Sequence, residues 1–158
     1  MLTVKGVELD RRTVMYLETI LWAETVLLPV PEDELIDDRM DVAENHALYG
    51  VSENEPLEDH FGIEDFDTSS LIKACEDVHD FFLWLEESDL AERVAEFASD
   101  EHVAYDFWLT RRGHGAGFWD GDYGDAMDDE LGELLTEKCK EFPSQDVIVM
   151  ENGRLFIE

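Results

Sequence analysis

Residues 106–125, DFWLTRRGHGAGFWDGDYGD, concentrate the side chains that could carry chemistry. His114 near a carboxylate is a pairing that general-base catalysis uses, and Asp120, Asp122 and Asp125 invite comparison with a calcium loop. Counted from Asp120, the places where an EF-hand requires an acid, a glycine and a glutamate hold Gly, Asp and Leu. Turn formation and helix capping explain these aspartates more simply. A divalent-metal-binding module or small enzyme built on His114 and the turn 120–125 stays as an alternative.

The glycines of this stretch match a phosphate-binding loop in composition only. Gly113, Gly115 and Gly117 follow Arg111 and Arg112, but a phosphate loop leads directly into a helix, and the residues after these glycines favour a strand. The stretch also contains no Ser or Cys that would serve as a nucleophile. We therefore expect no catalytic residue, no metal and no cofactor.

The elements that must position these residues are predicted to be a β-hairpin. Aromatic and β-branched residues favour a strand at 107–111 and a returning strand at 116–119, and glycine in the reversal at 112–115 supplies the positive φ that a tight turn needs. Four aromatic residues belong to this hairpin: Phe107, Trp108, Phe118 and Trp119. We expect most of them in the core, although alternation would direct one of each adjacent pair outward as a protein contact.

The remaining C-terminal residues predict a helix and a second hairpin. Apolar spacing indicates a helix at 125–142, which Pro143 ends. Strands at 146–150 and 154–157 flank Asn-Gly, the strongest two-residue turn signal.

The N-terminal part of the chain is predicted to be mostly helical. Asp10 is a good N-cap for a helix at 11–27, whose apolar residues surround it almost completely, as in a core helix or a homodimer face. The best-defined helix is expected at 69–87, after Asp67, and a shorter one follows at 89–99. The acidic segment 32–67 reads as a solvated loop.

The expected fold class is α+β, with helices packed on one face of a small antiparallel sheet made of two C-terminal hairpins around a helix. The chain of 158 residues suits a single domain, 1–158, with a mostly helical acidic lobe at 1–100 and a hairpin-helix-hairpin lobe at 101–158. Cys75 and Cys139 stand singly on apolar helical faces, which indicates buried thiols in a reducing cytoplasm. The chain has no apolar run near the roughly 20 residues of a membrane span, so we expect no membrane partner.

Charge dominates the composition. Forty-one acidic residues against eleven Lys and Arg give a formal net charge of -30. Such a surface repels nucleic acid and attracts basic partners. Three explanations stay open: solubility alone, life in high salt as in a halophile, and imitation of a phosphate backbone by a DNA or RNA mimic. The third predicts a partner protein with a basic nucleic-acid-binding groove and no direct nucleic-acid binding, for a chain that is monomeric or homodimeric.

The predicted contact surface joins the acidic segment to the carboxylate faces of the two long helices, with Trp84 as an apolar anchor. Its residues are Glu32, Asp33, Glu34, Asp37, Asp38, Glu53, Glu55, Glu58, Asp59, Glu64, Asp65, Glu76, Asp77, Asp80, Trp84, Glu87, Asp129, Glu133 and Glu137.

The segment HVAYDFWLTRRGHGAGFWDGDYGD resembles a family of small acidic proteins encoded by bacteriophages, which carries a similar DFWLTRxGHGAGFWD motif. The N-terminal stretch GVELDRRTVMYLETILWAE resembles the family's opening more loosely. The residues that carry the motif here are Asp106, Trp108, Arg111, Gly113, His114, Gly115, Gly117, Trp119 and Asp120. The resemblance implies a phage setting and the host cytoplasm. By analogy with other small acidic phage proteins, it suggests a non-enzymatic inhibitor of host defence, such as an anti-restriction or anti-CRISPR protein.

Overall fold

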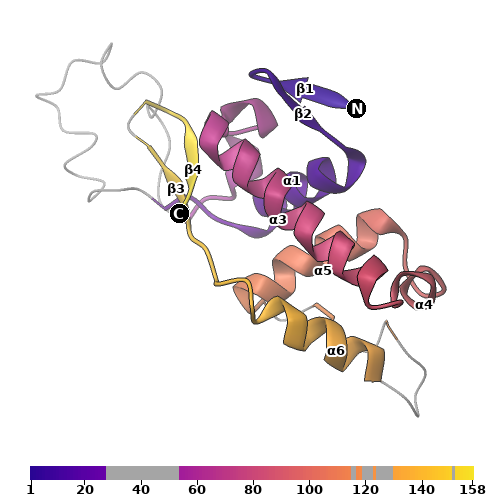
Figure 1. The fold of residues 1–158 in the computed structure, drawn as a ribbon. Coiled ribbons are helices and arrows are strands. Elements are labelled where there is room, and N and C mark those ends of the chain that lie inside the picture. The colour runs from indigo at the N-terminus through magenta and orange to yellow at the C-terminus, as the bar shows by residue number, and fades with distance from the viewer. Residues whose placement is uncertain (28–53, 115–116, 119–122, 124–129, 151) are drawn as a thin grey trace, which may run out of the picture.

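The computed structural model describes residues 1–27, 54–114, 117–118, 123, 130–150 and 152–158. It has the expected α+β class, with helices and two small antiparallel sheets of two strands each (Figure 1). The sheets lie near the two ends of the chain and the helices lie between them in sequence. The expected acidic positions Glu32, Asp33, Glu34, Asp37, Asp38, Glu53 and Asp129 fall outside the described residues, as do Gly115, Trp119 and Asp120.

The chain begins with a short hairpin that leads into the first helix. Strands β1 (Leu2–Val4) and β2 (Val7–Leu9) pair around Lys5 and Gly6, which both have positive φ. Helix α1 (Arg11–Ala23) follows, and its N-cap Asp10 accepts a hydrogen bond from the Thr13 backbone N–H, as predicted.

Helix α1 is shorter than predicted, because the backbone after Ala23 pairs with a distant segment instead of continuing the helix. Thr25 forms an antiparallel bridge with Pro56, and the Val26 N–H donates to the Glu55 carbonyl. These bonds bring the short helices η2 (Leu57–Asp59) and η3 (Ile63–Asp65) beside α1.

Three helices form the centre of the molecule. Helix α3 (Thr68–Glu87) is capped by Asp67 and matches its predicted span closely. Helix α4 (Ala91–Ala95) is a short link to α5 (Asp100–Arg112), and α5 packs extensively against α1 (Figure 1). One cluster of buried residues extends from Leu9 to Ile157, so residues from both predicted lobes share a core.

The predicted strand at 107–111 is wrong, because these residues belong to α5. Ser99 caps the helix by accepting from the His102 N–H, acids occupy its first turn, and Arg111 and Arg112 occupy its last. Asp106 and Leu109 are buried, and the helix's other buried residues recur with helical spacing: Val103, Ala104, Phe107, Trp108 and Arg111. The expected hairpin is therefore a helix followed by a left-handed turn, and Phe107, Trp108 and Phe118 are all buried.

The end of α5 is a Schellman motif. The Gly113 N–H donates to the Thr110 carbonyl, and the His114 N–H donates to the Leu109 carbonyl. Gly113 has a φ of +75°, in the left-handed region. Glycine is favoured here because a Cβ is costly in that conformation.

The C-terminal hairpin forms as predicted and closes the fold against α3. Helix α6 (Glu130–Cys139) leads to strands β3 (Val147–Val149) and β4 (Leu155–Ile157), with Gly153 at positive φ in the turn. Leu155 bridges to Phe66, and the Ile157 N–H donates to the Ser70 hydroxyl. No helix in the described ranges is long and apolar enough to cross a membrane.

Replacing Gly113 tests the helix end. We expect Gly113→Ala to lower the free energy of unfolding by about 1 kcal/mol, because an L-residue is strained at this φ. No atom lies within 4 Å of the added Cβ, so the cost is in the backbone alone. Urea unfolding measures the loss, and Gly113→Asn is the matched control because Asn tolerates the left-handed region better. Equal stability of all three proteins would contradict the assigned turn.

Candidate functional site

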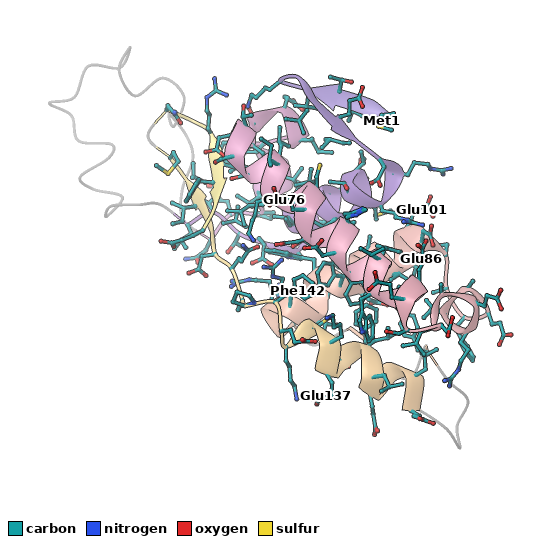
Figure 2. All side chains as sticks on the ribbon, in the orientation of Figure 1. Met1, Glu76, Glu86, Glu101, Glu137 and Phe142 are labelled. Atoms are coloured by element: carbon teal, nitrogen blue, oxygen red, sulfur yellow. The ribbon has the colours of Figure 1, made fainter. Side chains whose placement is uncertain are left out.

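The predicted acidic surface is exposed over much of the described chain. Glu76, Asp80 and Glu87 are exposed on α3, and Glu133 and Glu137 are exposed on α6. Figure 2 labels Glu76 on α3 and Glu137 on α6, which places carboxylates on separate helices. The α3 residues span eleven positions, or roughly 16 Å at 1.5 Å per residue.

A second group of exposed acids lies on the short helices beside α1. Glu58 and Asp59 on η2 and Glu64 on η3 are exposed. Asp65 is half-buried and its carboxylate accepts the Gly62 N–H, while Glu55 is half-buried and paired with His60. These two carboxylates therefore help to shape the segment locally.

Most of the exposed acids lack a cation close by. Within the described residues, no Lys, Arg or His side chain forms an ion pair with the following acids: Glu58, Asp59, Glu64, Glu76, Asp80, Glu87 and Glu133. Glu137 differs, since Lys140 lies 2.7 Å away. Lys5 lies close enough to Glu64 for a longer-range attraction, and otherwise the potential of these acids is reduced mainly by water and salt.

Asp77 was wrongly predicted to lie on the exposed face of α3. Asp77 is only 5% exposed, and Arg111 Nη1 lies 2.7 Å from its Oδ2. Lys73 Nζ lies 3.2 Å from Oδ1. Helical spacing explains why Asp77 is buried. It lies three residues after Ala74 and four before Phe81, and both of these are on the buried face of α3.

Trp84, the predicted apolar anchor, is half-buried on α3. Its ring lies 5.8 Å from that of Phe81, and Lys138 Nζ from α6 lies 5.4 Å from the ring centroid. A cation within about 6 Å of an indole face is attracted by the ring quadrupole. Trp84 thus already makes contacts inside the protein on two sides.

The motif residue Arg111 is the centre of a buried polar network. Its side chain donates from Nη1 to Asp77 and to the Tyr16 hydroxyl at 3.1 Å, and from Nε to the Pro143 carbonyl at 2.8 Å. The guanidinium carbon lies 5.9 Å from the Phe107 ring centroid and 5.5 Å from that of Phe142. One residue therefore ties together α1, α3, α5 and the segment after α6.

Burial around this network keeps neighbouring groups protonated. It raises the pKa of the Tyr16 hydroxyl well above its ordinary value, although the nearby Arg111 charge opposes the shift. Burial also raises the pKa of the Cys139 thiol, again against the effect of Arg111. Neither group carries a charge near neutral pH.

A second network joins the ends of α1 and α5 through Glu24, which sequence reasoning missed. Glu24 is 7% exposed, and its Oε2 accepts from Trp108 Nε1 at 2.9 Å and lies 2.5 Å from His114 Nε2. Its Oε1 accepts from Arg112 Nε at 3.2 Å. The only sequence signal was an acid inside the predicted helix 11–27, whose residues are mostly apolar.

Arg112 extends this network to the C-terminal hairpin. Its Nη1 lies 3.1 Å from Asp146 Oδ1 and 3.3 Å from the Ser144 hydroxyl, just before β3. Chain segments that are far apart in sequence therefore meet at the end of α5.

Asp106 forms a third buried group of the motif. Its Oδ2 accepts from the Tyr123 hydroxyl at 2.7 Å and lies 3.0 Å from His102 Nε2. The described motif residues with polar side chains, namely Asp106, Trp108, Arg111 and His114, thus all make contacts within the fold. Gly113 ends α5 and Gly117 is buried.

The metal alternative depends on a turn that lies largely outside the described residues, since 119–122 and 124–129 are not described. In the described part of the chain, no three His, Cys, Asp or Glu side chains gather closely enough to hold a metal ion. His114 Nε2 faces the Glu24 carboxylate, a pairing that also occurs in general-base sites.

Comparison with known proteins identifies no relative. No protein-family model, no curated protein and no solved structure matches this chain.

Breaking the Arg111–Asp77 pair tests its structural role. We expect Asp77→Asn to lower the free energy of unfolding by about 3 kcal/mol or more, because it leaves a buried guanidinium without its counter-charge. The exposed neighbour provides the control, and Glu76→Gln should stay within about 0.5 kcal/mol of wild type. Urea unfolding at neutral pH measures both.

A double variant separates charge from packing in this pair. Asp77→Leu combined with Arg111→Met should recover much of the stability lost in Asp77→Asn, since an apolar pair often replaces a buried ion pair without loss. If Asp77→Asn were as stable as Glu76→Gln, the network would not support the fold.

Proposed function

We propose that this protein is a bacteriophage-encoded inhibitor that binds a host nucleic-acid-binding protein, such as a defence nuclease, by presenting carboxylates where that protein expects phosphates. The observation that carries the proposal is how the charges are arranged. Arg111 and Arg112 neutralise acids inside the fold. By contrast, Glu58 and Asp59 of η2, Glu64 of η3 and the acids on the outer face of α3 are exposed without ion-pair partners in the described residues.

The charge exceeds what solubility requires. A net charge with a magnitude of roughly 2–8 keeps a small domain soluble, and this chain carries -30. Clustered carboxylates repel one another and weaken the fold. A function that uses the negative potential explains why these acids are not interspersed with Lys or Arg.

The geometry requires several elements to act together. Each DNA strand carries one charge per about 3.4 Å of helix axis. Of the four exposed acids of α3, Glu76, Asp80 and Glu87 share one face, and they are only three charges over roughly 16 Å. This helix alone is a poor imitation of a strand, so the surface that meets a basic groove must also include acids of η2 and η3.

The phage setting rests on the resemblance of the 102–125 segment to phage-encoded acidic proteins. The structure gives that segment a folding role, since the described motif side chains are buried in the core or bonded to α1 and α3. In this proposal the motif supports the scaffold and the acidic surface contacts the host protein.

Capture from a bacterial lysate tests the proposal. The immobilised protein should retain discrete nucleic-acid-binding proteins at about 50 mM salt, release them as salt approaches 1 M, and release them to duplex DNA as a competitor. Retained proteins that DNA does not displace would contradict mimicry.

Charge reversal then locates the contact surface. We expect Glu76→Lys, Asp80→Lys and Glu87→Lys together to abolish capture of the DNA-displaced proteins. The matched control is Glu92→Lys, Glu96→Lys and Glu158→Lys, which changes the net charge equally at other exposed positions. Circular dichroism confirms that both variants fold. Equal loss in both would mean that overall charge, and not this face, attracts the partner.

A further inference from the structure

An apolar groove with an acidic rim lies between α1, α5 and η2. One wall is the face of α1 that carries Met15, Glu18 and Trp22, which share a face at positions i, i+3 and i+7. Tyr105 of α5 and Glu58 of η2 form the other side. The pocket between them has a volume of about 510 Å³, and Thr19 and Leu21 line it as well.

Trp22, one of the two aromatic residues of this groove, is exposed to an unusual degree. Trp22 is 56% exposed, although its ring centroid lies only 5.7 Å from that of Tyr105. A large aromatic surface left in contact with water is costly for a monomer, and Trp is a residue type that dominates protein interfaces. The groove therefore has the character of an interface centre.

The apolar surface continues along α1. A second pocket of about 340 Å³ shares Met15 and Glu18 with the first and extends to Leu2, Leu9 and Val14. From Val14 to Trp22 the helix rises about 12 Å. This length suits a segment of a partner chain with more than one apolar side chain.

The charges around the groove select its occupant. Glu18 and Glu58 are exposed on its rim. In the adjoining pocket Glu101 is paired with Arg11 at 3.2 Å, so the negative charge of the rim comes from Glu18 and Glu58. A second copy of this chain would bring another charge of -30 to the same place, so like charges oppose self-association. A basic segment has the opposite charge, and an arginine can also stack on an indole ring.

We propose that the Trp22–Tyr105 groove docks a basic amphipathic segment of the partner protein, which inserts apolar side chains over Met15 and Trp22 and places Arg or Lys beside Glu18 and Glu58. This inference rests on the proposed binding to a basic host protein. The exposed acids on η2, η3 and α3 attract the partner at long range, and the groove adds short-range packing that charge alone does not provide.

Two fluorescent peptides of equal length and equal arginine content test the groove. In one, leucines occupy one helical face, and in the other serines replace them. Fluorescence anisotropy at about 150 mM salt measures binding to the wild type and to its variants. We expect Trp22→Ala to weaken the leucine peptide about tenfold and to change the serine peptide less than about twofold.

Matched variants test whether the loss of peptide binding is specific to this groove or follows from changing any exposed residue. Phe97→Ala removes another exposed aromatic ring, 46% exposed on the wild-type surface, and should leave both peptides unchanged. Glu18→Gln with Glu58→Gln should weaken the leucine peptide more than Glu92→Gln with Glu96→Gln, although each pair changes the net charge equally. Thermal melting followed by circular dichroism confirms the fold of each variant.

Each of the remaining outcomes would overturn the inference. Equal binding of both peptides, or no effect of Trp22→Ala, would mean that charge alone holds basic segments, and the proposed function would stand. If a leucine peptide with glutamines in place of its arginines bound as tightly as the original, the acidic rim of the groove would have no role in binding. A dimer in analytical ultracentrifugation that Trp22→Ala dissociates would assign the groove to a second copy. If neither arginine peptide binds at low salt, the proposed function fails with it.

Discussion

Arg111 carries a charge into the place where α1, α3, α5 and the segment after α6 meet, and the arrangement of these elements depends on neutralising that charge. A buried guanidinium without acceptors would cost several kcal/mol. Asp77, Tyr16 and the Pro143 carbonyl accept its hydrogen bonds, and each comes from a different part of the chain. Because a guanidinium donates in fixed directions, the three acceptors must be positioned together, which links the packing of one helix to that of the others.

Glu24 plays the complementary role as a buried anion. It accepts from Trp108 and Arg112 and faces His114, so the end of α1 is joined to the end of α5. The two networks share one helix, α5, whose residues supply cations and an indole N–H to acids of α1 and α3. Arg111 and Arg112 are therefore committed to buried acids, and among the described residues only a few outer acids, such as Asp100 and Glu137, have a cation beside them.

The sequence was sufficient for elements whose signals are local. Asp10 and Asp67 cap helices as expected, and Asn-Gly marks the C-terminal turn. The sequence was misleading at 107–111, where β-favouring aromatic residues suggested a strand. The helical spacing of Val103, Ala104, Phe107, Trp108 and Arg111 is visible in the same residues, and tertiary burial overrides β-propensity there.

The roles of individual charged residues were harder to predict, because they depend on contacts between distant segments. Asp77 looked like one acid among many on α3, and only the arrival of Arg111, 34 positions later, makes it a core residue. Glu24 and Trp108 lie 84 positions apart. Periodicity places a residue on a face of its own helix, but it does not say which helix or side chain will cover that face.

Salt acts on this protein in two opposite ways, and the separation of buried from exposed charges explains why. The Asp77–Arg111 pair and the Glu24 carboxylate are buried, so ions screen them little. Repulsion among the exposed acids instead falls over a Debye length of about 8 Å at physiological salt. Added salt should therefore reduce the repulsion among the exposed acids without weakening the buried interactions of the core. The same screening weakens attraction to a basic partner. A binding site made only of exposed carboxylates would lose affinity as its scaffold became more stable, and an apolar groove beside those carboxylates retains contacts that ions do not screen.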